Sequence, residues 1–184
     1  MKKIILETER LVLRPWRESD APDLYEYAKD DRVGPIAGWP VHQSIEESAG
    51  FIQTVFSQEG VYAVTIKGED RAIGCIGLIR GDKSNFPISD QEGEVSYWIG
   101  VPYWDNGYIP EAIKEIVRYG FEDLNLSTIW CGFIDGNEKS KKAQEKCGFK
   151  HHHTETNRYF DLIDKTGTEH VSYLTQTDWR TEHI

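Results

Sequence analysis

The chain has few cysteines, and their spacing does not suit a disulfide framework or a metal site. Three occur in 184 residues, at Cys75, Cys131 and Cys147, which is an odd number with no CxxC pair. Disulfide scaffolds use a dense, even set of cysteines, and zinc sites use closely spaced pairs. Three consecutive histidines, residues 151–153, would alternate faces on a strand, so at most two could share a ligand shell. We therefore expect a cytoplasmic protein that binds no metal.

Long apolar runs are also absent. The apolar stretch at residues 4–6 meets Glu7 after three residues, which is too short for the core of a signal peptide. No run approaches the roughly 20 apolar residues that a membrane-spanning helix needs. The sequence therefore predicts no membrane partner.

Basic residues are in deficit. The chain has 21 Lys and Arg against 31 Asp and Glu, and its net charge is −10. Nucleic-acid binding usually requires a basic face, so we do not expect a nucleic-acid partner. The acidic balance is compatible with a cationic substrate such as an amine.

Apolar residues suffice for one buried core, because they make up 39 % of the chain. We expect a single domain over residues 1–184. Strands are predicted at residues 10–16, 61–67, 72–80, 94–101 and 127–134, with further candidates at 149–154, 157–163 and 171–174. Helices are predicted at residues 19–29, 44–58, 110–124 and 137–147. The early strands pair locally and the later ones alternate with helices, which indicates a mixed α/β fold.

One strand leads through a short turn into a helix, between Glu94 and Ala112. Such a turn presents backbone N–H groups at the positive end of the helix dipole, which suits a phosphate or pyrophosphate. Gly107 is the one glycine in this turn, and one glycine is a weak phosphate signal. A plain strand-to-helix connection capped by Asp105 or Asn106 remains the alternative.

A second stretch, residues 137–150, reverses the charge of the chain locally. It holds five lysines against two glutamates, and Asn137 and Ser140 are spaced to face one groove from a helix start. We interpret it as an anion-facing patch, and a solvated helix face is the alternative.

Taken together, these segments resemble the GNAT superfamily of acyl-CoA-dependent N-acetyltransferases. The resemblance rests on residues 7–16, on Tyr-Trp-Ile at 97–99 leading into 104–112, on Asn137-x-x-Ser140 and on residues 145–149. It covers nearly the whole chain and is greatest for the branch of ribosomal-protein N-terminal-alanine acetyltransferases.

The resemblance implies a single-domain fold with a central mixed, mostly antiparallel, twisted sheet flanked by helices. The sheet would be splayed at Tyr97–Val101, with the cosubstrate acetyl-CoA in the opening. Backbone groups of Ile99 and Val101 would hold the pantetheine arm, Asn137 would face it, and Ser140 would lie near the sulfur. The pyrophosphate would be held by N–H groups of the turn at Trp104, Asn106, Gly107, Tyr108 and Ile109.

The turn departs from the superfamily pattern, which usually reads Gln/Arg-x-x-Gly-x-Gly/Ala. In the closer branch it usually reads Trp-Gly-(basic)-Gly-Tyr-Ala. Here Asp105 replaces a glycine, Asn106 replaces the basic residue, and Ile109 replaces the small residue. A carboxylate about 6 Å from a phosphate would cost roughly 1.4 kcal/mol at an effective dielectric constant of about 40.

Attack by an amine on a thioester needs a neutral amine and a proton for the leaving thiolate. Glu94 is the candidate base, and an exposed carboxylate at a sheet edge is the alternative. Ser140 is the candidate acid, and a serine that binds helix backbone is the alternative. Many superfamily members place a tyrosine four residues beyond this serine, where this chain has Gln144.

The sequence thus predicts direct acetyl transfer from acetyl-CoA to a primary amine within a ternary complex. The acceptor would be a protein N-terminus or a small-molecule amine, and the protein a monomer or homodimer. A catalytically weak acyl-CoA-binding module with a drifted pyrophosphate turn is the alternative. The loops at 31–44 and 81–92 would shape the acceptor site, but they contain no motif that names the acceptor.

Overall fold

The computed structural model describes residues 4–182, which form eight strands and five α-helices. The strands are β1 (Leu6–Glu7), β2 (Leu11–Pro15), β3 (Val61–Ile66), β4 (Ala72–Arg80), β5 (Glu92–Ile99), β6 (Thr128–Ile134), β7 (Lys150–Phe160) and β8 (Lys165–Thr175). The helices are α1 (Ala21–Ala28), α2 (Ile45–Phe51), α3 (Tyr108–Arg118), α4 (Glu138–Lys146) and α5 (Gln176–Glu182). Short π-helical segments, Ile52–Phe56 and Tyr119–Asp123, extend α2 and α3.

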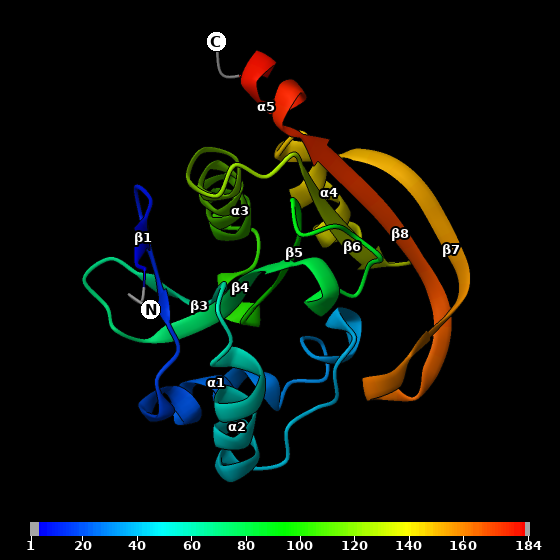
Figure 1. Cartoon of the computed structure of the whole chain (residues 1–184). Helices are drawn as coiled ribbons and strands as arrows, with labels where there is room; N and C mark the ends of the chain where they lie inside the picture. The colour runs from blue at the N-terminus through cyan, green and yellow to red at the C-terminus, as the bar shows by residue number, and fades with distance from the viewer. Residues whose placement is uncertain (1–3, 183–184) are drawn as a thin grey trace.

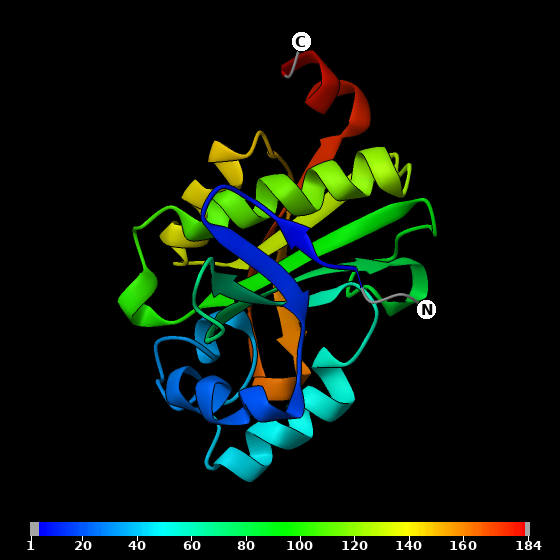
Figure 2. The ribbon, with the colours of Figure 1, turned by 90° about the vertical axis from the view of Figure 1, so that its left-hand side faces the viewer.

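All eight strands belong to one mixed sheet, in the order β1-β2-β3-β4-β5-β6-β8-β7. Every neighbouring pair is antiparallel except β5 and β6, which are parallel. Helices α3 and α4 lie on one side of the central strands, and α1 and α2 lie on the other (Figures 1 and 2). The predicted mixed, mostly antiparallel sheet flanked by helices is therefore confirmed.

The sheet splits between its two parallel strands. β5 and β6 are paired from Glu92 and Thr128 as far as Val95 and Cys131, and their pairing ends there. Beyond this point β5 continues along β4, whereas β6 continues along β8, so the strands part from Ser96 onward. The predicted splay is confirmed, and it begins one residue before Tyr97.

Helix α3 packs against the sheet through a continuous apolar stripe. Ile109, Ile113 and Ile116 recur at helical spacing, and each is buried in the core cluster. Burial of one such side chain contributes about 1.5–3 kcal/mol, so this stripe fixes how the helix lies on the sheet. The position of α3 also determines where the preceding turn lies.

Several element boundaries differ from the predictions. Helix α3 begins at Tyr108 rather than Pro110. The predicted strands at 149–154 and 157–163 merge into one strand, β7, which ends at Phe160, and residues 161–163 form a 3-10 turn. β8 is much longer than the predicted strand at 171–174. β7 is a sheet-edge strand whose side chains are mostly exposed, so cross-strand pairing with β8 defines it rather than an apolar pattern. In the described part of the chain, no helix has the length and apolar character needed to cross a bilayer.

Candidate active site

A cavity of about 300 Å³ opens where β5 and β6 part. It brings together Glu94 and Ser140, the predicted catalytic residues, with Asn137, which like Ser140 is also predicted to contact the cosubstrate. Three residues without a predicted role also line it: Tyr97, Arg158 and Glu169. Its walls come from β5, β6, the start of α4, the end of β7, and the loop at residues 36–39.

Glu94 lies in this cavity with its carboxylate held on both oxygens. Ser84 Oγ and the Asn85 backbone N–H donate to Oε2, each at 2.7 Å, and Asn85 Nδ2 donates to Oε1 at 3.0 Å. Glu94 is only 5 % exposed, so the alternative of an exposed edge carboxylate is wrong. The turn that follows β4 therefore orients this side chain toward the place where the strands separate.

Glu169 on β8 is a second carboxylate in the cavity. Burial raises its pKa, the nearby Arg158 guanidinium opposes that shift, and the negative charge of Glu94 adds to it. Arg158 Nε lies 2.7 Å from Glu169 Oε2. A carboxyl group in a cleft whose pKa is raised toward neutrality is suited to proton transfer.

The Glu169 carboxylate lies directly over Gly132 of β6. A Cβ atom added at Gly132 would be 2.5 Å from Glu169 Oε1, so a larger residue there would displace the carboxylate from its present position. The sequence analysis missed Glu169 because its predicted strand began at residue 171. In the actual register Glu169 pairs with Ile134 and thus faces the split.

Ser140 is surrounded by side chains on the inner face of α4. Its Oγ lies 2.8 Å from the Tyr97 hydroxyl oxygen and accepts a hydrogen bond from Gln144 Nε2 at 3.3 Å. The Ser140 hydroxyl thus contacts side chains rather than helix backbone. Tyr97 is a phenol that the sequence analysis missed, and burial raises its pKa well above the ordinary value.

Gln144 is fixed by a buried chain of polar groups. Its Nε2 also donates to the Gly132 carbonyl at 3.2 Å, and its Oε1 accepts a hydrogen bond from Ser172 Oγ. The same Ser172 Oγ lies 3.1 Å from the Cys131 carbonyl oxygen, which competes with Gln144 for its single proton. This arrangement turns the amide N–H groups of Gln144 toward Ser140 and the split.

Asn137 is the N-cap of α4. Its Oδ1 accepts the Ser140 backbone N–H at 3.1 Å, while its Nδ2 lies 3.5 Å from the Ile36 carbonyl. N-cap side chains satisfy backbone donors that a helix start leaves free. Contact with a ligand in the cavity would therefore come from the Asn137 Nδ2 group.

The turn before α3 has the strained backbone that an anion-binding loop uses. Asp105 and Gly107 have φ values of 62° and 77°, and Gly107 is the N-cap residue. The alternative of a connection capped by Asp105 or Asn106 is therefore wrong. The buried side chain of Ile109 belongs to the core, so its bulk does not face the turn's open side.

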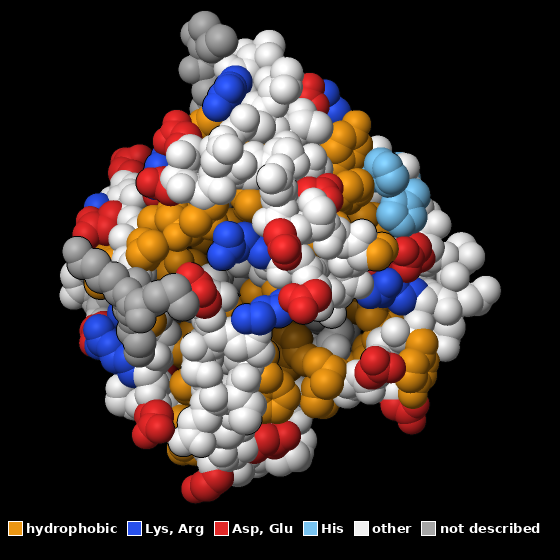
Figure 3. Space-filling model, in the orientation of Figure 1, with side chains coloured by type: hydrophobic (Ala, Val, Ile, Leu, Met, Phe, Trp, Pro, Cys, Tyr) orange, Lys and Arg blue, Asp and Glu red, His pale blue; other side chains and the backbone are white. Residues whose placement is uncertain are grey.

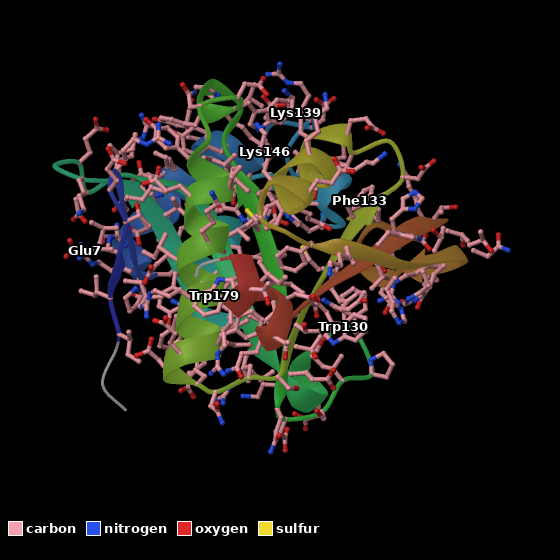
Figure 4. The ribbon with its side chains drawn as sticks, turned by 90° about the horizontal axis from the view of Figure 1, so that it is seen from above. Glu7, Trp130, Phe133, Lys139, Lys146 and Trp179 are labelled. Atoms are coloured by element: carbon pink, nitrogen blue, oxygen red, sulfur yellow. The ribbon has the colours of Figure 1, made fainter. Side chains whose placement is uncertain are left out.

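Two cations flank this turn. Lys139 Nζ of α4 binds the Asp105 carboxylate at 2.5 and 2.7 Å and lies 5.3 Å from the centre of the Trp104 ring. Figure 4 labels Lys139, which lies in the first turn of α4, and Lys146, which ends the helix. Arg10 Nη1 donates to the Asn106 carbonyl at 3.1 Å, and its guanidinium lies over the Tyr108 ring. The related branch has a basic residue at position 106. In this chain, Arg10 and Lys139 place positive charge beside the turn instead.

Glu111 fixes Arg10 in place. Its carboxylate accepts hydrogen bonds from the Thr8 hydroxyl, the Arg10 backbone N–H and Arg10 Nε, at 2.5, 2.8 and 2.7 Å. These bonds join the start of β2 to the first turn of α3. Arg10 therefore reaches the turn through a link that the sequence spacing does not reveal.

Ile99 and Val101 lie where the strand ends, but their carbonyls are already engaged. Trp104 Nε1 donates to the Ile99 carbonyl at 3.0 Å, and the Trp104 backbone N–H donates to the Val101 carbonyl at 3.1 Å. The indole thus folds back on the end of β5. Each carbonyl has a second lone pair available for a further bond.

Comparison with known proteins agrees with this architecture. Residues 10–150 match the acetyltransferase (GNAT) domain family. The uncharacterized N-acetyltransferase YoaA of Bacillus subtilis (strain 168) is 30 % identical over 151 residues, which cover 79 % of this chain and 82 % of YoaA. YdaF of the same organism is 33 % identical over 76 residues, which cover 41 % of this chain and 39 % of YdaF.

YdaF is provisionally named as a ribosomal N-acetyltransferase, which is consistent with the branch that the sequence resembles. A crystal structure of a GNAT-family acetyltransferase from Bacillus anthracis superposes with a TM-score of 0.82 at 20 % identity, covering 95 % of this chain and 99 % of that one. The family match and the YoaA relationship, together with the split sheet, give one conclusion: the chain belongs to the GNAT acetyltransferase family.

Proposed function

We propose that the protein transfers an acetyl group from acetyl-CoA to a primary amine by direct attack within a ternary complex. The observation that carries this proposal is the cavity at the split of β5 and β6. It contains a buried carboxylate, Glu94, and a buried hydroxyl, Ser140, which is the pair of groups that the two proton transfers need.

The chain's own residues fit the cosubstrate. The turn at 104–109 ends in a helix N-terminus whose first N–H groups have no intrahelical partner, and Arg10 and Lys139 flank it with positive charge. Trp104, Asn106, Gly107, Tyr108 and Ile109 would hold the pyrophosphate through backbone N–H groups. Backbone groups of Ile99 and Val101 and the Asn137 amide would hold the pantetheine arm.

Glu94 would remove one proton from the ammonium group, directly or through a water molecule, and pass it to solvent. The neutral nitrogen then forms the new C–N bond as the C–S bond breaks. Ser140 would donate its hydroxyl proton to the leaving sulfur and regain one from the nitrogen as the amide forms. Hydrogen bonds from Tyr97 and Gln144 would stabilise the Ser140 oxygen while it lacks its proton.

The alternative of a weak binding module rested on the negative charge of Asp105 and on the bulk of Ile109 in the turn. The surroundings of both residues make this alternative less favourable. The Asp105 carboxylate is paired with Lys139, which reduces its repulsion of a phosphate. Ile109 packs into the core instead of crowding the turn. We therefore favour the enzyme.

A screen of thiol release from acetyl-CoA over a panel of amines and peptides tests the proposal. The enzyme releases free CoA thiol with at least one amine, at a rate that depends on amine concentration. A binding module would bind acetyl-CoA in a calorimeter but release no thiol with any acceptor. The acceptor panel should include a ribosomal-protein N-terminal peptide and small amines.

A further inference from the structure

The charged groups of the cavity leave it acidic. Three carboxylates line it, from Glu94, Asp161 and Glu169, against one guanidinium, from Arg158. An amine in its ammonium form is therefore attracted to this cavity, and an anionic acceptor is repelled.

Arg158 is not free to bind an anionic acceptor. Its Nη1 donates to Glu155 Oε2 at 2.9 Å, its Nη2 donates to the Asn85 carbonyl at 3.2 Å, and its Nε lies 2.7 Å from Glu169 Oε2. Its two Nη groups thus have hydrogen-bond acceptors within the protein, and its positive charge is paired with the Glu169 carboxylate. A free amino acid would bring a carboxylate into this cavity and find no unpaired cation there.

Part of the lining of this cavity is apolar and partly exposed. Ile36, Tyr159 and Leu162 line it, and their exposed fractions are 39 %, 55 % and 63 %. These three are among the few large hydrophobic side chains that the described residues leave exposed. Apolar surface gathered at the mouth of a cavity is typical of a binding site.

The loop at residues 35–39 closes this wall. Gly38 adopts a left-handed conformation, and a Cβ atom there would lie 3.9 Å from both Ile134 Cδ1 and Phe160 Cδ1. The loop therefore lies beside Ile134 of β6 and Phe160 of β7, and both of these apolar side chains also line the cavity. Figure 3 shows hydrophobic side chains around a hollow on this face of the molecule, and Figure 4 shows Phe133 on the side of α4 where β7 and β8 lie.

We propose that the acceptor is a primary amine attached to an apolar group and lacking a neighbouring carboxylate. Glu94 and Glu169 hold the ammonium group, and Ile36, Tyr159 and Leu162 cover the apolar group. Within the reaction proposed above, on which this inference rests, the pairing of Arg158 makes the cavity reject free amino acids. Peptide N-termini and small apolar amines share this chemistry.

Four matched acceptors test the proposal in the thiol-release assay at saturating acetyl-CoA. Leucinamide and glycinamide differ only in the apolar side chain, and leucinamide and leucine differ in the carboxylate. Spermidine supplies positive charge without a compact apolar group. We expect kcat/KM for leucinamide to exceed that for each of the other three by about tenfold or more. Equal values for leucinamide and glycinamide, or a preference for leucine or spermidine, would overturn the proposal.

Substitution at the rim tests the apolar wall. Leu162→Ser should lower the ratio of kcat/KM for leucinamide over glycinamide severalfold, because the side chain lies at the cavity. Val55→Ser removes an exposed apolar side chain outside this cavity and should leave the ratio unchanged. An unchanged ratio in the Leu162 variant, with unchanged melting temperature, would remove this wall from the acceptor site.

The two proposals fail in different ways. Thiol release with several amines but without these preferences leaves the acetyl transfer standing and overturns the acceptor class. If no acceptor reacts while acetyl-CoA binds, calorimetry with CoA present compares leucinamide with leucine. Tighter leucinamide binding would then support the acceptor class although the transfer had failed, and equal or weaker binding would overturn both. A peptide amide that begins with Leu is compared with leucinamide in the same assay. The comparison shows whether peptide N-termini or small apolar amines are the preferred acceptors, and either preference supports the proposed acceptor class.

Discussion

The Tyr97 hydroxyl oxygen lies 2.8 Å from Ser140 Oγ, although the two residues are 43 positions apart. Tyr97 comes from β5 and Ser140 from the first turn of α4, so this contact joins one strand of the split to the helix that follows the other. The superfamily pattern places a tyrosine four residues beyond the serine, where this chain has Gln144. Here a phenol from the opposite wall lies beside the same hydroxyl.

Tyr97→Phe should lower kcat for thiol release about tenfold, the scale of one lost hydrogen bond of about 1–1.5 kcal/mol. The KM for acetyl-CoA should change little, because the lost bond acts on Ser140 during sulfur departure. Tyr25→Phe, which removes a phenol bonded to the Gln43 carbonyl, is the matched control. A Tyr97 variant with wild-type kcat would mean that Gln144 alone supports Ser140.

Glu94→Gln should lower kcat by about 10²-fold or more and leave acetyl-CoA affinity nearly unchanged, because an amide cannot accept the proton. The amide oxygen can still accept from Ser84 and Asn85, so the variant should fold. Glu92→Gln, on the same strand, is the control. Near wild-type turnover at pH 7 would move the base to Glu169 or water.

Asp105→Asn should tighten acetyl-CoA binding by a few-fold, up to about tenfold, because it removes a negative charge and frees Lys139. Asparagine tolerates the left-handed backbone at this position, so the turn should keep its shape. The gain should shrink as salt rises, because exposed charges are screened. Calorimetry at two salt concentrations measures both effects, with Glu59→Gln as the control. Weaker binding with unchanged melting temperature would mean that Asp105 and Lys139 act together to hold the cosubstrate.

Glu111→Gln should lower the free energy of unfolding at neutral pH by about 1 kcal/mol. Burial acts to raise the Glu111 pKa, but hydrogen bonds from Thr8 and Arg10 outweigh it, so the pKa lies below the ordinary value of 4.5. A lowered folded-state pKa stabilises the protein above the unfolded-state value, and this contribution is lost as the pH falls through the folded-state pKa. The difference between wild type and variant in urea titrations should therefore be constant above about pH 5.5 and shrink below 4.5. A difference that grows toward acid would contradict the hydrogen-bond assignment.

Local sequence signals determined most of the elements. The helical spacing of Ile113, Ile116 and Val117 predicted the helix at residues 110–124, most of which is α3, and Ser44 caps α2 by accepting the Glu47 backbone N–H at 3.1 Å. Hydrophobic periodicity and capping depend on neighbours within about one helical turn, so they can be read from the chain. The order of these elements, with the motif residues at 97–99 and 137–140, was enough to predict the family.

Only the tertiary structure decided which groups meet in the cavity. Glu169 joins Glu94 because β8 pairs with β6 in one register, and Tyr97 reaches Ser140 because β5 and β6 part after Val95. Two basic side chains reach the turn before α3 from distant positions in the chain. Arg10 is 96 residues from its partner Asn106, and Lys139 is 34 residues from its partner Asp105. Such contacts depend on strand register and on the packing of distant elements, and no local pattern encodes either. The sequence by itself thus determined the elements and the family, whereas strand register and strand separation brought Glu169 and Tyr97 into the cavity.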